Sequence, residues 1–245
     1  MLPPRDYRQE ATVRWDMSRI VKTSSTLVLV LAAACSNSGT SAQAAPELAA
    51  AAGPYAAEFP GFDATAIAKK LQGTWVFKGS MDQPTVWSIE GTKVTQVEAD
   101  GKTKSGTLEI SSPCIVTMRM ADDGGQPFSY TFAGDTLHLG MGDAGAIVGK
   151  TTYACAYPSL FRTTGDTCEI QAGNQSKRGK LSYLWEKTEC TVDATSFSGK
   201  DQFDRTAKLQ IAGTALYDEQ LKTSVATKVA DLAAGKAKQA ELATK

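Results

Sequence analysis

Short β-type runs separated by turn residues occupy the chain from Trp75 onward, and they restrict the possible fold more than any other feature. The runs follow one another at roughly 8–12 residues, and pairs such as Glu90-Gly91 and Asp100-Gly101 tolerate the positive φ angles of tight hairpins. Regular spacing with turn signals is typical of sandwiches and barrels. The pattern therefore predicts an all-β domain, either an antiparallel barrel or a sandwich.

Two segments show helical patterns instead. Asp63 can cap a short helix that ends at Gly73, just before the first β-type run. After Gly213, apolar residues recur mainly at steps of three and four, which predicts one apolar helix face. The residues of that face are Leu216, Leu221, Val225, Val229 and Leu232. The expected domain therefore has a short N-terminal helix and a C-terminal helix.

Residues 17–34 have the composition of a signal peptide. Arg19 and Lys22 form a positive start, and an apolar run leads to Ala34. That run is too short to span a membrane, which takes ~20 residues. Residues 1–16 carry both charge signs without periodicity, and we interpret them as the product of a start codon placed too early.

The end of the apolar run, Leu31-Ala32-Ala33-Ala34-Cys35, resembles the lipobox of bacterial lipoproteins. In that family small residues precede a cysteine that receives acyl chains such as palmitate and becomes the mature N-terminus. Ala32 departs from the usual leucine, so a secretory peptide cut at Ala-x-Ala is the alternative. Residues 35–61 have the composition of a flexible tether. The resemblance implies an anchor at Cys35, with Ser36 favouring the outer membrane, on its periplasmic or its surface face.

The charge of the exported part argues against nucleic acid as a partner. Residues 1–34 contain five of the 26 basic and three of the 26 acidic residues, which leaves 21 against 23 and a formal charge of −2. A nucleic-acid-binding surface needs a basic excess on one face.

Four cysteines remain in the exported part, and an even number in an oxidising compartment predicts two disulfides. They are Cys114, Cys155, Cys168 and Cys190. Three pairings are possible, and we favour Cys155 with Cys168 and Cys114 with Cys190. A metal site is the weaker interpretation, because there is no CxxC spacing and His138 is the single histidine.

Two glycine-rich patterns suggest nucleotide binding, and neither has the right surroundings. Residues 144–151 match a relaxed Walker A motif and residues 140–145 match GxGxxG. Both motifs require a helix directly afterwards, whereas residues 151–158 are rich in β-formers and end in proline. No cofactor is therefore expected.

The catalytic patterns that we considered are also missing, so we expect no enzyme. The sequence lacks a Gly-x-Ser-x-Gly elbow. His138 alternates with Leu137 and Leu139, which predicts a solvent-facing strand histidine rather than a catalytic base.

Gly73-Thr74-Trp75 follows directly on the short helix, and this Gly-x-Trp resembles the first strand of lipocalins and related calycin barrels. The segment 130–139 also resembles a hairpin of lipocalin-like domains. The resemblance implies a barrel over residues 62–212, followed by a helix and tail over 213–245. It further implies that an arginine, here Arg205, stacks on Trp75 to close the base of the barrel. A Thr-Asp-Tyr motif, which the family also has, is not found.

In such a barrel, strand alternation would turn five side chains into a ligand-binding interior. They are Trp87, Val94, Val116, Phe132 and Tyr183. The expected function is that of a lipid-anchored, non-catalytic module that binds a small hydrophobic ligand. The alternative is a structural or interaction protein of the cell envelope, with a protein partner and a barrel too full of side chains to hold a ligand.

Overall fold

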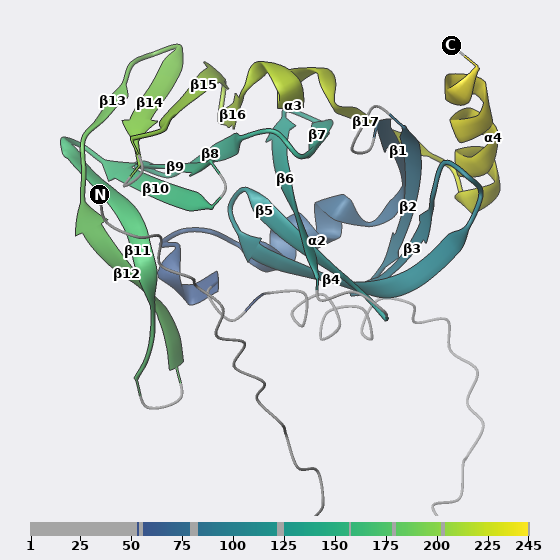
Figure 1. Ribbon diagram of the computed structural model, residues 1–245, viewed down its shortest axis with the longest axis horizontal. Coiled ribbons are helices and arrows are strands. Elements are labelled where there is room, and N and C mark those ends of the chain that lie inside the picture. Colours follow the sequence, from purple (N-terminus) through teal and green to yellow (C-terminus); the bar gives the residue numbers. More distant parts are fainter. Residues whose placement is uncertain are drawn as a thin grey trace, which may run out of the picture. The chain divides into compact units, whose positions relative to one another are not determined.

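The computed structural model describes residue 53 and residues 56–78, 83–121, 125–156, 158–177, 180–201 and 204–244. The predicted signal peptide, the lipidation site Cys35 and most of the predicted tether lie outside these residues. Strands dominate the described chain and form two antiparallel sheets (Figure 1). No helix within the described ranges combines the length and apolar character needed to cross a bilayer.

The first sheet is a closed antiparallel barrel, which confirms the predicted fold class. Its eight strands follow the order β1-β17-β7-β6-β5-β4-β3-β2. Their bounds are β1 (Gly73–Lys78), β2 (Pro84–Glu90), β3 (Lys93–Val97), β4 (Thr103–Ser112), β5 (Ile115–Met120), β6 (Gln126–Ala133), β7 (Thr136–Gly140) and β17 (Val225–Val229). The first seven strands form a meander, and β17 closes it from much later in the chain.

The second sheet is inserted between β7 and β17. Its strand order is β12-β11-β10-β9-β8-β16-β15-β14-β13. The bounds are β8 (Ala144–Val148), β9 (Thr151–Ala156), β10 (Ser159–Thr164), β11 (Thr167–Lys177), β12 (Lys180–Lys187), β13 (Cys190–Val192), β14 (Ser196–Lys200), β15 (Thr206–Ala212) and β16 (Ala215–Tyr217). Residues 62–212 therefore contain most of two sheets rather than one barrel.

The helices differ partly from the prediction. Helix α2 (Ala64–Leu71) forms as expected, and the Asp63 side chain accepts a hydrogen bond from the Ala66 amide at 2.9 Å. The predicted helix over 216–232 is replaced by β16, the short α3 (Glu219–Thr223) and β17, while α4 (Leu232–Ala243) begins where that helix should end. Tertiary pairing explains this, because β17 supplies the strand between β1 and β7 that closes the barrel.

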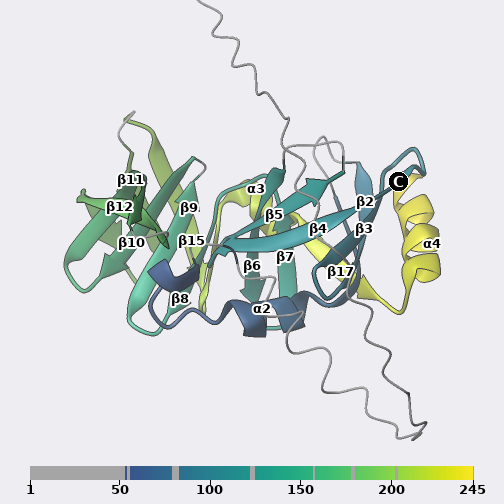
Figure 2. The same cartoon turned by 90° about the horizontal axis from the view of Figure 1, so that it is seen from below.

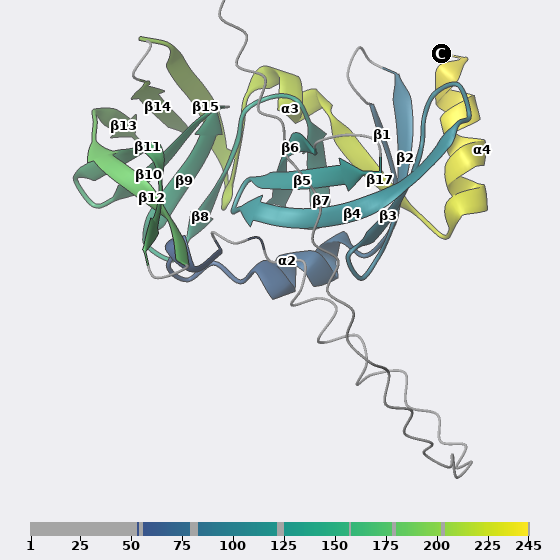
Figure 3. The same ribbon diagram turned by 60° about the horizontal axis from the view of Figure 1, so that its bottom comes forward.

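The barrel interior is a packed core. Trp87 lies between Phe77 and Phe128 in edge-to-face contacts, with ring centroids 5.0 and 4.8 Å apart. Helix α2 adds Ala68 and Leu71 to the same core from one end (Figures 2 and 3). Aromatic edge-to-face packing adds to the stabilisation from buried area.

The two disulfides predicted from the cysteine count are present, but they pair Cys114 with Cys155 and Cys168 with Cys190, at Cα distances of 6.0 and 5.8 Å. The favoured pairing was wrong because Cys155 and Cys168 face opposite sides of the second sheet. Their cross-strand partners on β10 are Leu160 and Thr163, three residues apart. Side chains alternate between the two faces along a strand, so residues three positions apart point to opposite faces.

The Cys168–Cys190 disulfide also shows that the second sheet curls. Cys190 lies on β13, the last strand of the order, and Cys168 lies on β11, next to the strand at the opposite end. Thr188, directly after β12, donates from its Oγ1 to the Lys200 carbonyl of β14 at 3.3 Å, so the two ends of the strand order lie close together. The sheet thus encloses its own apolar core, which includes Phe161 and Phe197.

Helix α4 packs on the outside of the barrel, over β1 and β2. Val76, Val86 and Val97 form the apolar patch beneath it. The buried Gln239 side chain donates from Nε2 toward the carbonyls of Pro84, Val97 and Glu98, at 2.9, 3.1 and 3.0 Å. These carbonyls lie at the ends of β2 and β3, so the side chain ties α4 to the barrel rim.

Candidate functional site

The interior site predicted for a ligand is occupied by the protein's own side chains. Trp87, Val94 and Val116 do face the barrel interior, and each is at most 1% exposed. They belong to one cluster with the surrounding bulky side chains. They therefore contribute to the core and do not line the clefts described below.

Phe132 and Tyr183 lie elsewhere. Phe132 is half-buried at the edge of the barrel core, where it also lines an external cleft. Tyr183 is not on the barrel at all, because β12 belongs to the second sheet. The structure thus separates the five predicted ligand-binding residues into three places.

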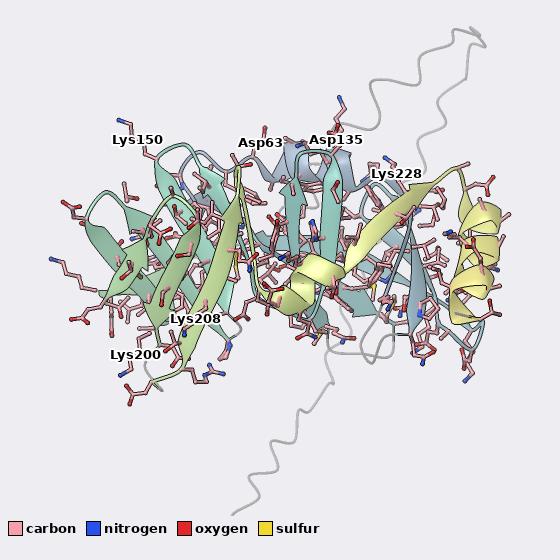
Figure 4. The ribbon with its side chains drawn as sticks, turned by 90° about the horizontal axis from the view of Figure 1, so that it is seen from above. Asp63, Asp135, Lys150, Lys200, Lys208 and Lys228 are labelled. Carbon is pink, nitrogen blue, oxygen red and sulfur yellow. A yellow bond between two sulfur atoms is a disulfide. The ribbon has the colours of Figure 1, made fainter. Side chains whose placement is uncertain are left out.

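The predicted closing pair also differs. Arg205 precedes β15 of the second sheet, and its Nε donates to the Asp201 carboxylate at 2.8 Å. The cation over the Trp75 ring is Lys228, with Nζ 5.1 Å from the ring centroid. Lys228 lies on β17 and is labelled in Figure 4. Lys228 is the direct cross-strand neighbour of Trp75. Gly73, with φ of 108°, begins β1 beside them.

The motifs set aside in the sequence prove to have structural roles. The Walker-like segment forms the β8–β9 hairpin, with Gly149 at φ 61° in its turn. His138 was predicted to face solvent, yet it is only 7% exposed, because α3 and β16 cover it. Its Nδ1 lies 3.2 Å from the Leu221 carbonyl, and its ring packs at 4.9 Å from that of Tyr217. Within the described residues, no three His, Cys, Asp or Glu side chains gather in a way that could hold a metal.

Two external clefts lie where the barrel meets the second sheet. The first, which we call the α2 cleft, has a volume of about 270 Å³.

 The α2 cleft is formed by Phe62, Ile67, Lys70, Phe132, Ile147 and Val148, which come from α2 and its lead-in, β6 and β8.

The α2 cleft is lined by polar and apolar groups in nearly equal parts, and its apolar side chains are incompletely covered. Its five apolar side chains named above are all half-buried. The Lys70 ammonium lies 5.3 Å from the centroid of the Phe132 ring at the edge of the cleft. A lysine in the last turn of a helix interacts favourably with the helix dipole, and its stem covers apolar surface. The cleft thus presents concave apolar area with one cation beside it.

The second cleft, which we call the bulge groove, lies between β4–β6 of the barrel and β9–β12 of the second sheet. Its volume is about 320 Å³, and its walls include Ser111, Ile115, Arg119, Leu160, Gln171 and Tyr183. The Cys114–Cys155 disulfide joins the two sheets at this groove, where Cys155 contributes to the wall. The lining is mixed, with hydroxyl, amide and guanidinium groups among apolar side chains.

A pair of carboxylates lies at the chain crossings between the two sheets. Asp143 precedes β8, and Asp218 follows β16. Burial, and secondly the negative charge of Asp218, raises the pKa of the Asp143 carboxyl to about 6. The sequence showed no signal for this pair, since the two residues are distant in the chain.

Comparisons with protein-family models, with curated proteins and with solved structures found no match for this chain. The closed eight-stranded antiparallel barrel is compatible with a lipocalin-like barrel.

Proposed function

We propose that this chain is a lipid-anchored, non-catalytic binding protein of the bacterial envelope that holds a small apolar ligand in the α2 cleft. One observation carries the proposal: five half-buried apolar side chains from three separate parts of the chain line the same concavity. Ligand sites are typically concave, mostly apolar and provided with a few polar groups. The barrel then serves as a rigid support for the cleft rather than as the container.

The size of the cleft restricts the ligand. A volume of 270 Å³ lies just below the usual range of roughly 300–1,000 Å³ for small-molecule sites. A ligand that buries on the order of 200 Å² of apolar surface there gains about 5 kcal/mol at ~25 cal/mol per Å², before the cost of association. We therefore expect a compact molecule that binds with modest affinity.

The test is a fluorescence titration of the full chain with the neutral dye N-phenyl-1-naphthylamine. We expect saturable enhancement, and we expect Ile67→Gln to abolish it by placing an amide in the apolar wall. Val192→Gln is the matched control, since Val192 is also an apolar side chain, 39% exposed, but lies on β13. Equal binding by wild type and Ile67→Gln would contradict the proposed site.

The packed barrel interior favours a second candidate, an interaction protein of the envelope that has no small-molecule ligand. An eight-stranded barrel either fills its interior with side chains or holds one small ligand, and this one is filled. Absence of any saturable change with neutral dyes, in protein whose thermal unfolding is cooperative, would favour this alternative.

The anchor part of the proposal rests on the sequence. The lipobox-like ending at Cys35 and the tether-like composition that follows support attachment to the outer membrane. Protease treatment of intact cells tests whether the anchored protein lies on the periplasmic or on the surface face of that membrane.

A further inference from the structure

We propose that the bulge groove is a second binding site, independent of the α2 cleft, for a neutral sugar that carries acetyl groups. Its position gives the first reason. Among the described strand pairs, the register shifts at two places, Ile110/Ser112 in β4–β5 and Gln171/Gly173 in β11–β12. Both places contribute to this groove, one from each sheet. Bulges re-aim side chains and are frequent beside functional sites.

Tyr183 gives the groove an aromatic wall that its neighbours hold in place. Its ring centroid lies 5.8 Å from that of Phe59 and 5.7 Å from that of Trp185. The Arg162 guanidinium covers the Trp185 ring at 4.0 Å, so Trp185 is fixed in turn. A half-buried, preorganised tyrosine offers both an apolar ring for the C–H face of a sugar and a polar hydroxyl.

The polar groups of the groove match the hydroxyl groups of a sugar. The Gln171 side chain lines the groove and takes part in none of the hydrogen bonds found among the described residues, so its amide can both donate and accept. The Ser111 and Thr117 hydroxyls lie 2.8 Å apart, and each retains capacity for a further hydrogen bond.

The charges around the groove are compensated within the protein. Arg119 pairs with Glu109 at 3.3 Å, and Arg162 pairs with Glu169 at 2.6 Å. Since these guanidinium groups already face carboxylates, the groove favours a ligand without net charge.

Apolar side chains and volume restrict the sugar further. Ile115, Pro127 and Leu160 lie among the polar lining groups. They would contact methyl groups, which acetamido sugars have and simple hexoses lack. A volume of about 320 Å³ fits one or two pyranose rings.

The experiment is isothermal titration of the full chain with N,N′-diacetylchitobiose, with cellobiose as the probe that lacks acetyl groups. We expect a dissociation constant on the order of 1 mM for the first and at least about tenfold weaker binding for the second. Gln171→Leu, which keeps the side-chain size, and Tyr183→Ala should each weaken binding about tenfold. Leu184→Ala is the control on the same strand, because Leu184 is 46% exposed and points to the other face.

Three outcomes would overturn the proposal. They are an absence of heat up to on the order of 10 mM diacetylchitobiose, equal binding of the two disaccharides, and unchanged binding by both Gln171→Leu and Tyr183→Ala. Cosedimentation with an insoluble cell-wall glycan distinguishes the source of the sugar. Binding to both the glycan and the disaccharide indicates a polymeric ligand, and binding to the disaccharide alone indicates a free one.

Discussion

Asp143 and Asp218 hydrogen-bond to each other at the two points where the chain passes between the barrel and the second sheet. The Asp143 amide donates to the Asp218 carboxylate at 2.9 Å, and the Asp218 amide donates to the Asp143 carbonyl at 3.0 Å. Asp218 also caps α3, accepting from the Leu221 amide at 2.6 Å. The two crossings are therefore tied together, although 75 residues separate them.

This pair predicts a pH-dependent stability. Burial raises the pKa of Asp143 from 3.8 to about 6. The contribution of its protonated carboxyl to the stability of the fold is therefore fully present below the pKa of the unfolded chain, and it is lost as the pH rises through about 6. Asp143→Asn keeps the backbone bonds and removes the charge. We expect it to stabilise the fold at pH 8 by about 1 kcal/mol, after allowance for solvent screening, and to change little at pH 4. Urea unfolding at both pH values measures this.

The control for that measurement is Asp135→Asn, in the exposed turn between β6 and β7. Because this carboxylate lies in an exposed turn, its replacement should change the free energy of unfolding little. A gain for Asp143→Asn that is as large at pH 4 as at pH 8 would contradict the charge argument.

The disulfide pairing predicts that non-reducing peptide mapping will join Cys114 to Cys155 and Cys168 to Cys190. Replacing both Cys114 and Cys155 with alanine should lower the free energy of unfolding by roughly 2–4 kcal/mol, because the disulfide restricts the unfolded chain. A peptide that joins Cys155 to Cys168 would show that the two sheets are not connected as described.

The packing of helix α4 on the barrel depends on Gly235 and on the buried side-chain amide of Gln239. A Cβ at Gly235 would lie 2.7 Å from Cγ1 of Val86, so Gly235→Ala should destabilise by about 1–3 kcal/mol through overpacking. Gln239→Leu should cost about 1–3 kcal/mol, since it removes the donor from three carbonyls. Thermal unfolding measures both, and Lys236→Ala on the exposed face of α4 should have little effect.

The lipid anchor predicts that Cys35→Ala will release the protein from the membrane fraction into the soluble periplasmic fraction. Mass spectrometry of the wild-type protein should show the mass of the acyl chains, and protease treatment of intact cells should show which face of the membrane carries it. Unchanged membrane retention without an acyl mass would contradict lipidation.

Local sequence signals predicted the local structure well. The turn glycines Gly91 and Gly101 adopt φ angles of 60° and 82°, as the hairpin interpretation required. Asp63 caps α2 as expected. These features depend on backbone conformations and hydrogen bonds within a few residues, so neighbouring residues are sufficient to specify them.

The partners of those strands were decided only by the tertiary structure. The sequence by itself determined the β-rich character, the hairpin turns, α2 and the presence of two disulfides. It did not determine that β17 rather than β15 closes the barrel, and hence that Lys228 rather than Arg205 lies over Trp75. Nor did it place Cys155 and Cys168 on opposite faces, or Tyr183 outside the barrel. Strand pairing joins residues far apart in the chain, and each pairing sets which face a side chain occupies, so local patterns cannot specify it.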